Sequence, residues 1–221
     1  MAKRTSNVSA AATTRKSPDA EERGPSFCVV GMGASAGGLE AFRQLLAALP
    51  KDTGLSFVVV QHLAPAHASS LAEILSRSTS MPVVEVKDES RIEPDHVYVI
   101  PPAKSMVIAD RNLKLQPREE TGQHHPIDLF FKSLAQDQGD TSIGVVLSGT
   151  GNDGTAGLRE IKAAGGITFA QDKSAQHDGM PRSAIAAQCV DFVLSPRRIA
   201  EEIARIAHHP YTALTPSGSA T

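Results

Sequence analysis

The chain has 221 residues, of which 41% are hydrophobic and 21% are charged, and its formal net charge is −2. This near-neutral balance gives no attraction to polyanions, so we do not expect nucleic acid as a partner. The apolar runs are much shorter than the roughly 20 residues of a bilayer-spanning helix, so we expect no membrane insertion. Cys28 and Cys189 have no spacing typical of a disulfide framework or a zinc site, which favours a cytoplasmic protein.

Composition divides the chain into one folded part and two tails. Residues 1–25 are rich in Ala, Ser, Thr and charged side chains, and residues 211–221 are rich in Ser, Thr, Gly and Pro. We expect both segments to be disordered, because they hold too little apolar side chain to form a core. Residues 26–210 are long enough to form one domain with a sizeable core.

Within 26–210, short β-branched runs alternate with longer amphipathic stretches, a pattern typical of an α/β fold. We predict a doubly wound, mainly parallel, Rossmann-like sheet of six or seven strands. The region 106–115 has a different rhythm, and Asp110, Arg111 and Asn112 at its centre predict an antiparallel β-hairpin. The predicted strands are 27–30, 57–60, 83–86, 96–100, 143–147, 167–170 and 192–194, and the predicted helices are 39–49, 69–77, 126–134, 155–164, 182–187 and 199–207.

Reactive side chains follow the ends of three predicted strands. Ser35 lies in a glycine-rich turn between a strand and a helix, where small neighbours leave its hydroxyl uncovered. His62 follows the next strand, and Asp153 lies in a second glycine-rich loop. Because the ligand crevice of an open parallel sheet lies outside the carboxyl ends of its strands, we expect these three side chains to converge there.

A serine, a histidine and an aspartate that converge in this way are typical of nucleophilic catalysis. Serine needs a base within hydrogen-bond reach, and a buried carboxylate can hold the histidine in the required tautomer. We therefore predict Ser35 as the nucleophile, His62 as its base and Asp153 as the group that orients His62. Backbone N–H groups near Ala36 and Thr150 are predicted to bind the oxyanion. The order Ser, His, Asp, in which the histidine precedes the acid, indicates a fold other than that of the common α/β-hydrolases.

Five motifs, in the same order, resemble the catalytic domain of the chemotaxis-type protein-glutamate methylesterases, called CheB. The resemblance implies a methylesterase-like catalytic domain over 26–210, with the family's nucleophile, histidine and aspartate at Ser35, His62 and Asp153. It implies hydrolysis of γ-glutamyl methyl esters on a methylated receptor or sensory protein, with release of methanol, and in many members deamidation of glutamine. It implies no cofactor. The motifs are GASAGG (33–38), VVVQHL (58–63), HHPIDLFF (124–131), LSGTGNDG (147–154) and DGMPRSAI (178–185).

The chain departs from that family at three points. Chemotaxis members often have threonine where this chain has Ala36, and methionine where it has Thr150; backbone oxyanion contacts tolerate both changes, whereas the fit of the substrate depends on them. The segment before the domain is too short for the family's phosphoryl-accepting receiver domain, so we expect a stand-alone form whose substrate need not be a chemotaxis receptor. By analogy, Met180 and Pro181 line the cleft.

Other interpretations of the same residues remain open at this stage. Gly31, Gly33 and Ala36 match the G-x-G-x-x-G/A dinucleotide pattern, although the next strand lacks the acidic residue that binds the ribose. Ser35 taken alone is a candidate helix cap, His62 a structural histidine and Asp153 a cap for the helix that follows it.

Three further interpretations concern metal, a neighbouring acid and the loss of catalysis. His67, His124, His125 and His177 have no metal-ligand spacing, so we predict no metal site. Asp128 is expected to support the start of its own helix. A non-catalytic binding module is the competing functional class, and it is disfavoured because all three candidate catalytic residues are present.

Overall fold

The computed structural model describes residues 27–61, 71–117 and 124–208. His62 and His67 lie outside the described residues, as do both predicted tails. Among the described helices, none is long and apolar enough to cross a bilayer.

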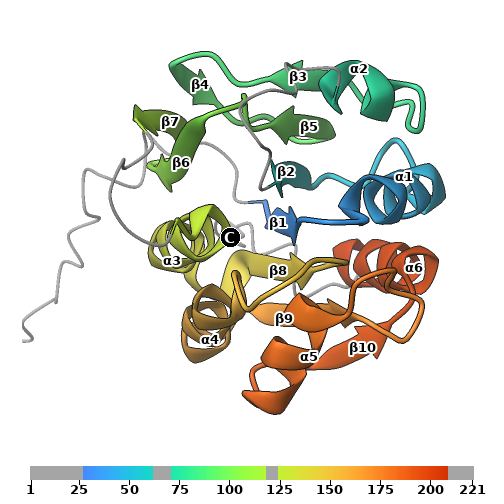
Figure 1. Ribbon diagram of the computed structural model, residues 1–221. Helices are drawn as coiled ribbons and strands as arrows, with labels where there is room; N and C mark the ends of the chain where they lie inside the picture. The colour runs from blue at the N-terminus through green and yellow to red at the C-terminus, as the bar shows by residue number, and fades with distance from the viewer. Residues whose placement is uncertain (1–26, 62–70, 118–123, 209–221) are drawn as a thin grey trace, which may run out of the picture.

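The centre of the molecule is a seven-stranded parallel sheet, which confirms the predicted fold class (Figure 1). The strand order β10-β9-β8-β1-β2-β5-β3 places the first strand in the middle, so the chain winds outward from β1 in both directions. The strands of this sheet are β1 (Val29–Ala34), β2 (Ser56–Gln61), β3 (Val83–Glu85), β5 (His96–Val99), β8 (Ser142–Val146), β9 (Ile167–Gln171) and β10 (Phe192–Leu194). The central strands β1 and β8 are buried along their whole length, as expected for a parallel sheet covered on both faces.

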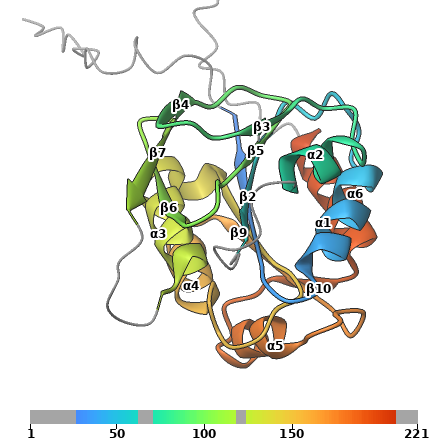
Figure 2. The same ribbon diagram turned by 45° about the horizontal axis from the view of Figure 1, so that its top comes forward.

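Helices cover both faces of this sheet and create two cores (Figures 1 and 2). Helices α1 (Gly38–Ala48), α2 (Leu71–Ser76) and α6 (Pro196–Ala207) pack on one face, where Phe42 and Ile203 are fully buried. Helices α3 (Pro126–Gln138), α4 (Thr155–Ala163) and α5 (Gly179–Ala186) pack on the other, where Phe130 and Leu158 are fully buried. A short 3-10 turn, η2 (Gly139–Thr141), connects α3 to β8.

A second, antiparallel sheet lies over α3. It contains β4 (Glu89–Arg91), β6 (Lys104–Ala109) and β7 (Asn112–Pro117), in the order β4-β7-β6. The predicted hairpin is confirmed, with Asp110 and Arg111 at positive φ between the paired residues at its end. Strand β4 was not predicted, because its polar residues have no strand periodicity and it forms only by pairing with β7.

Two element boundaries near the functional loops differ from the prediction. Strand β1 continues to Ala34, so Gly31 and Gly33 lie inside the strand, not in the turn that follows it. A side chain at Gly33 would lie 2.3 Å from Ile127 of α3, so glycine here allows that helix to approach the sheet. Helix α5 begins at Gly179 and not at Arg182, because the Met180 N–H donates to the Gly149 carbonyl and holds the first turn beside β8.

Candidate active site

Ser35 and Asp153 lie in loops that follow two neighbouring strands of the sheet, β1 and β8. Ser35 directly follows β1, and Asp153 lies in the loop between β8 and α4. Strand β2 ends at Gln61, on the other side of β1, and the next residue is His62, which lies outside the described residues. The registers β1–β2 and β1–β8 are parallel, so the loops after these strands start at the same end of the sheet.

The loop that carries Ser35 is held by its backbone. The Ser35 N–H donates to the Ser148 carbonyl at 3.0 Å, which joins the end of β1 to the loop after β8. The Gly38 N–H donates to the Ser35 carbonyl at 3.0 Å and closes a tight turn into α1. The cap of α1 is Gly37, at φ 73°, so Ser35 is not the helix cap that its sequence context also allowed. The Ser35 side chain is half-buried.

Ser148 is the centre of a small hydrogen-bond network under this loop. Its hydroxyl donates to the Ala36 carbonyl at 2.8 Å and accepts from the His177 N–H at 3.0 Å. The Gly149 N–H donates to the His177 carbonyl at 2.9 Å. Ser148 is 1% exposed, so these bonds form away from water and connect the loops after β1, β8 and β9.

The Asp153 carboxylate is buried and bonded to the first turn of another helix. Its two oxygens accept the backbone N–H groups of Ile127, at 3.2 Å, and Asp128, at 2.9 Å, both in α3. Asp153 was also a candidate cap for the following helix α4, but the cap of α4 is Gly154, at φ 89°. Asp153 thus caps α3, not α4, because the folded chain brings the two helix starts together.

The charge state of Asp153 reflects opposing influences. Burial raises the pKa of this carboxyl above its ordinary value of 3.8, and the nearby Asp128 charge adds to that rise. The N–H groups of Asp128 and Ile127 lower the pKa, as does His125, whose Nδ1 lies 3.7 Å from an Asp153 oxygen. The helix donors favour the carboxylate, whereas its removal from water disfavours it.

Asp128 mirrors Asp153. We expected it to support the start of its own helix α3, but its carboxylate accepts the Gly157 N–H of α4 at 2.7 Å. Asp153, which precedes α4, therefore accepts N–H groups from the first turn of α3, and Asp128, in α3, accepts one from the first turn of α4. The sequence alone did not indicate this exchange, because it depends on the packing of α3 against α4.

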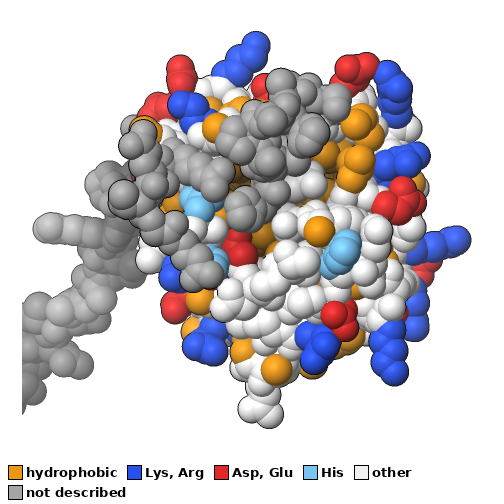
Figure 3. Space-filling model, in the orientation of Figure 1, with side chains coloured by type: hydrophobic (Ala, Val, Ile, Leu, Met, Phe, Trp, Pro, Cys, Tyr) orange, Lys and Arg blue, Asp and Glu red, His pale blue; other side chains and the backbone are white. Residues whose placement is uncertain are grey.

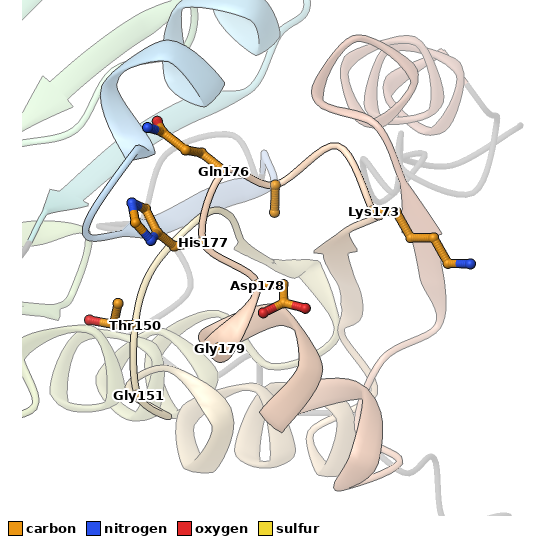
Figure 4. A pocket seen from close by; sticks show the side chains of 8 residues that line it. Thr150, Gly151, Lys173, Gln176, His177, Asp178 and Gly179 are labelled. Carbon is orange, nitrogen blue, oxygen red and sulfur yellow. The ribbon is translucent and has the colours of Figure 1, made fainter.

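A cavity of about 610 Å³ opens beside the Ser148 network (Figure 4). Thr150 and His177 lie at one side of it, and the Lys173 side chain points away from them. In the wider view of Figure 3, Lys and Arg side chains and most of the acidic ones lie around the rim, whereas the histidine side chains lie nearer the middle. The cavity is lined by Thr150, Gly151, Lys173, Ala175, Gln176, His177, Asp178 and Gly179.

The predicted oxyanion and cleft residues occupy different positions. Ala36 follows Ser35 and is half-buried, and Thr150 is exposed and lines the cavity. Met180 is fully buried, and its sulfur lies where a side chain at Gly149 would be. It therefore packs against the backbone of the loop after β8. A side chain at Gly149 would also lie 3.1 Å from Ser35 Cβ, which shows how closely the two loops approach.

The dinucleotide pattern has a packing explanation. Gly31 and Gly33 lie within β1, and side chains there would contact Phe130 and Ile127 of α3. A phosphate-binding loop needs its glycines in the turn between strand and helix, where backbone N–H groups face the ligand. These two glycines instead serve the contact between helix and sheet.

His125, Asp128 and Asp153 each offer a possible metal-ligand atom within 4.8 Å of the others. Three backbone N–H groups already bond the two carboxylates. The amino ends of two helices carry partial positive charge, which opposes a cation at this position. We therefore interpret this cluster as a capping arrangement.

Sequence reasoning did not identify Ser148 or the His177 loop as parts of this site. Ser148 is the second residue of the LSGTGNDG motif, and its place directly after a buried strand was the available signal. Nothing in the sequence indicated that its hydroxyl would join three loops, because its partners are 112 and 29 positions away.

Comparison with known proteins places this arrangement in a family. The chain is similar to the crystal structure of the Thermotoga maritima CheB methylesterase catalytic domain, with a TM-score of 0.76 and 29% identity, covering 82% of this chain and 99% of that one. The protein-glutamate methylesterase/protein-glutamine glutaminase of Pectobacterium atrosepticum is 37% identical over 181 residues, which is 79% of this chain and 51% of that protein.

A third relative has no assigned activity. An uncharacterized 104.1 kDa protein of Rhodobacter capsulatus is 47% identical over 135 residues, covering 61% of this chain and 14% of that protein. The chain thus spans about half the length of the Pectobacterium relative and a smaller part of the Rhodobacter one. The family model described as CheB methylesterase matches residues 30–203. The chain therefore belongs to the CheB methylesterase family.

Proposed function

We propose that this domain hydrolyses γ-glutamyl methyl esters on a methylated receptor or sensory protein and releases methanol. Membership of the family supports the reaction class, and the relatives named as both methylesterase and glutaminase support a second leaving group, the ammonia of a glutamine side chain. The observation that carries the proposal is the direct backbone bond between Ser35 and Ser148. It unites the loop of the nucleophile with the loop that leads to Thr150 and Asp153.

The proposed reaction has two steps through an acyl-enzyme. Ser35 Oγ attacks the ester carbonyl carbon while His62 takes the hydroxyl proton, and Asp153 stabilises the resulting imidazolium. The imidazolium then protonates the departing methoxide, which leaves as methanol. Water, deprotonated by His62, attacks the acyl carbon, and the glutamate carboxylate is released as Ser35 regains its proton.

Backbone N–H groups near Ala36 and Thr150 are proposed to bind the oxyanion in both steps. A preorganised donor of this kind is typically worth about 3 to 4 kcal/mol of transition-state stabilisation. The cavity beside Thr150 opens to solvent, which suits a side chain presented by another protein. We propose that the Thr150 side chain and the His177 loop, which line this cavity, contact the flanking residues of that protein.

The test is methanol release from a methylated receptor fragment by wild type, Ser35→Ala and a control, Ser90→Ala. Ser90 lies in β4 and bonds the Lys87 carbonyl, in the separate antiparallel sheet. We expect Ser35→Ala to lower kcat by roughly 10⁴- to 10⁶-fold. Ser90→Ala is expected to keep the wild-type rate. An unchanged rate in Ser35→Ala, with its folding verified by circular dichroism, would remove Ser35 from the mechanism.

A further inference from the structure

The starts of α3 and α4 depend on each other for capping. The residue before α3 is His125 and the residue before α4 is Gly154, and neither provides a side-chain hydrogen bond to its own helix. The first N–H groups of a helix have no partner within it and need acceptors from elsewhere. For α3 the acceptor is Asp153, from the loop before α4. For α4 it is Asp128, from α3.

This exchange works because the two helices pack at very short range. A side chain at Gly157 would lie 2.4 Å from Phe131 Cβ and 3.2 Å from the Asp128 backbone. A side chain at Gly154 would lie 2.9 Å from Ile127. Glycine at both positions lets the first turns approach closely enough for each aspartate to reach the other helix.

We propose that Asp128 is a positioning residue for Asp153, because its bond to the Gly157 N–H holds the start of α4, and with it the segment that carries Asp153, against α3. The inference rests on the proposed function, in which Asp153 orients His62. Asp153 precedes α4 by a single residue, Gly154, so a shift in the first turn of α4 moves the Asp153 backbone. Its carboxylate, bonded to α3, would then rotate or lose one of its two N–H partners.

The experiment compares Asp128→Ala and Asp128→Asn with a control, Asp137→Ala. Asp137 is also in α3, and its carboxylate accepts two backbone N–H groups, from Asp110 at 2.7 Å and Arg111 at 3.2 Å. Those bonds hold the hairpin of β6 and β7, far along the helix from Asp153. Asp137→Ala therefore removes a comparable structural contact without touching the start of α4.

We expect Asp128→Ala to lower kcat by roughly 10- to 100-fold with little change in KM, the range that follows when a reacting group is displaced by about 1 Å. Asp128→Asn should restore most of kcat, because its amide oxygen can accept the same N–H. Asp137→Ala should lower the melting temperature but leave kcat unchanged, with all rates measured below the melting transitions. Equal kcat in Asp128→Ala and wild type, or equal loss in Asp128→Ala and Asp128→Asn, would overturn the inference.

A second measurement separates this inference from the proposed substrate. A fluorophosphonate labels an activated serine covalently, and intact mass gives the rate without any ester substrate. If wild type labels at Ser35 but releases no methanol, the substrate assignment fails, and the labelling rates of the Asp128 variants still decide the positioning role. If wild type neither labels nor releases methanol, the proposed function fails, and the positioning role fails with it.

Discussion

The loops after β1 and β8 each hold a candidate catalytic side chain in place, but they do so through different contacts. The β1 loop presents Ser35 on a backbone held by the Ser148 carbonyl and hydroxyl, with small residues around it. The β8 loop presents Asp153 with both carboxylate oxygens bonded to α3. A nucleophile must keep its hydroxyl available to substrate, whereas an orienting carboxylate gains from being fixed. If both residues act as proposed, Ser35 contributes to function alone, whereas Asp153 contributes to function and also to folding through its bonds to α3.

The largest expected effects come from the two side chains themselves. Asp153→Ala should lower kcat by roughly 10⁴-fold, comparable to the loss in Ser35→Ala. It should also lower the free energy of unfolding by about 1 to 2 kcal/mol, because two helix N–H groups lose their acceptor. Ser35→Ala should leave that free energy within about 0.5 kcal/mol of wild type. Methanol release measures kcat, and urea unfolding measures the free energy of unfolding of each variant. Equal free energies of unfolding in Asp153→Ala and Ser35→Ala would contradict the proposed difference between the loops.

The next effect concerns the support of the β1 loop. Ser148→Ala removes the hydroxyl, so the Ala36 carbonyl loses its donor and the His177 N–H loses its acceptor. We expect a loss of about 1 to 3 kcal/mol in stability and roughly tenfold in kcat. Ser148→Thr keeps a hydroxyl and serves as the paired variant. A normal kcat in Ser148→Ala, measured well below its melting temperature, would contradict the supporting role.

Gly157 in α4 and Gly149 in the β8 loop should differ in their tolerance of a methyl group. Gly157→Ala would place Cβ against Phe131 Cβ and the Asp128 backbone, which cannot move without shifting α3. We expect a loss of about 1 to 3 kcal/mol from this overpacking. Gly149→Ala would meet chiefly the Met180 thioether, which can change rotamer, so its cost should be smaller. Thermal unfolding of both variants decides the order, and a larger loss in Gly149→Ala would reverse it.

The smallest expected effect is a change of folding stability with pH, which has opposite signs for Asp153 and Asp191. Burial raises the pKa of Asp153, so the folded state binds its proton more tightly than the unfolded state does. The stability that it contributes is present at low pH and is lost as the pH rises through the raised pKa. At Asp191 burial is outweighed by hydrogen bonds from Lys162 and Thr168, which lower the pKa, so its contribution is present above pH 3.8 and is lost as the pH falls through the lowered pKa.

Unfolding free energies of wild type, Asp153→Asn and Asp191→Asn across the acidic range measure these two contributions. Relative to Asp153→Asn, wild type should lose stability as the pH rises. Relative to Asp191→Asn, it should gain stability as the pH rises from strong acid. If the stability difference changed with pH in the same direction for both pairs, the cause assigned to one of the two pKa shifts would be wrong.

The regular elements could be predicted because their signals are local. The buried strands β1, β2 and β8 read as continuous apolar runs, and α1 and α6 show helical spacing of their apolar residues. The hairpin followed from turn-forming residues at its tip. Strand β4 and the early start of α5 were missed, since each depends on a partner far away in the chain.

By itself, the sequence determined the order of the strands and helices other than β4, the glycine-rich loops at the strand ends and the residue types available for catalysis. Each of these follows from periodicity, turn chemistry or a motif that can be recognised within a short segment. Only the tertiary structure decided that Ser148 joins three loops, that Asp153 caps α3 and that Asp128 bonds the first turn of α4. A hydroxyl or a carboxylate bonds whatever donor or acceptor lies within about 3 Å, and only the folded chain determines which one that is.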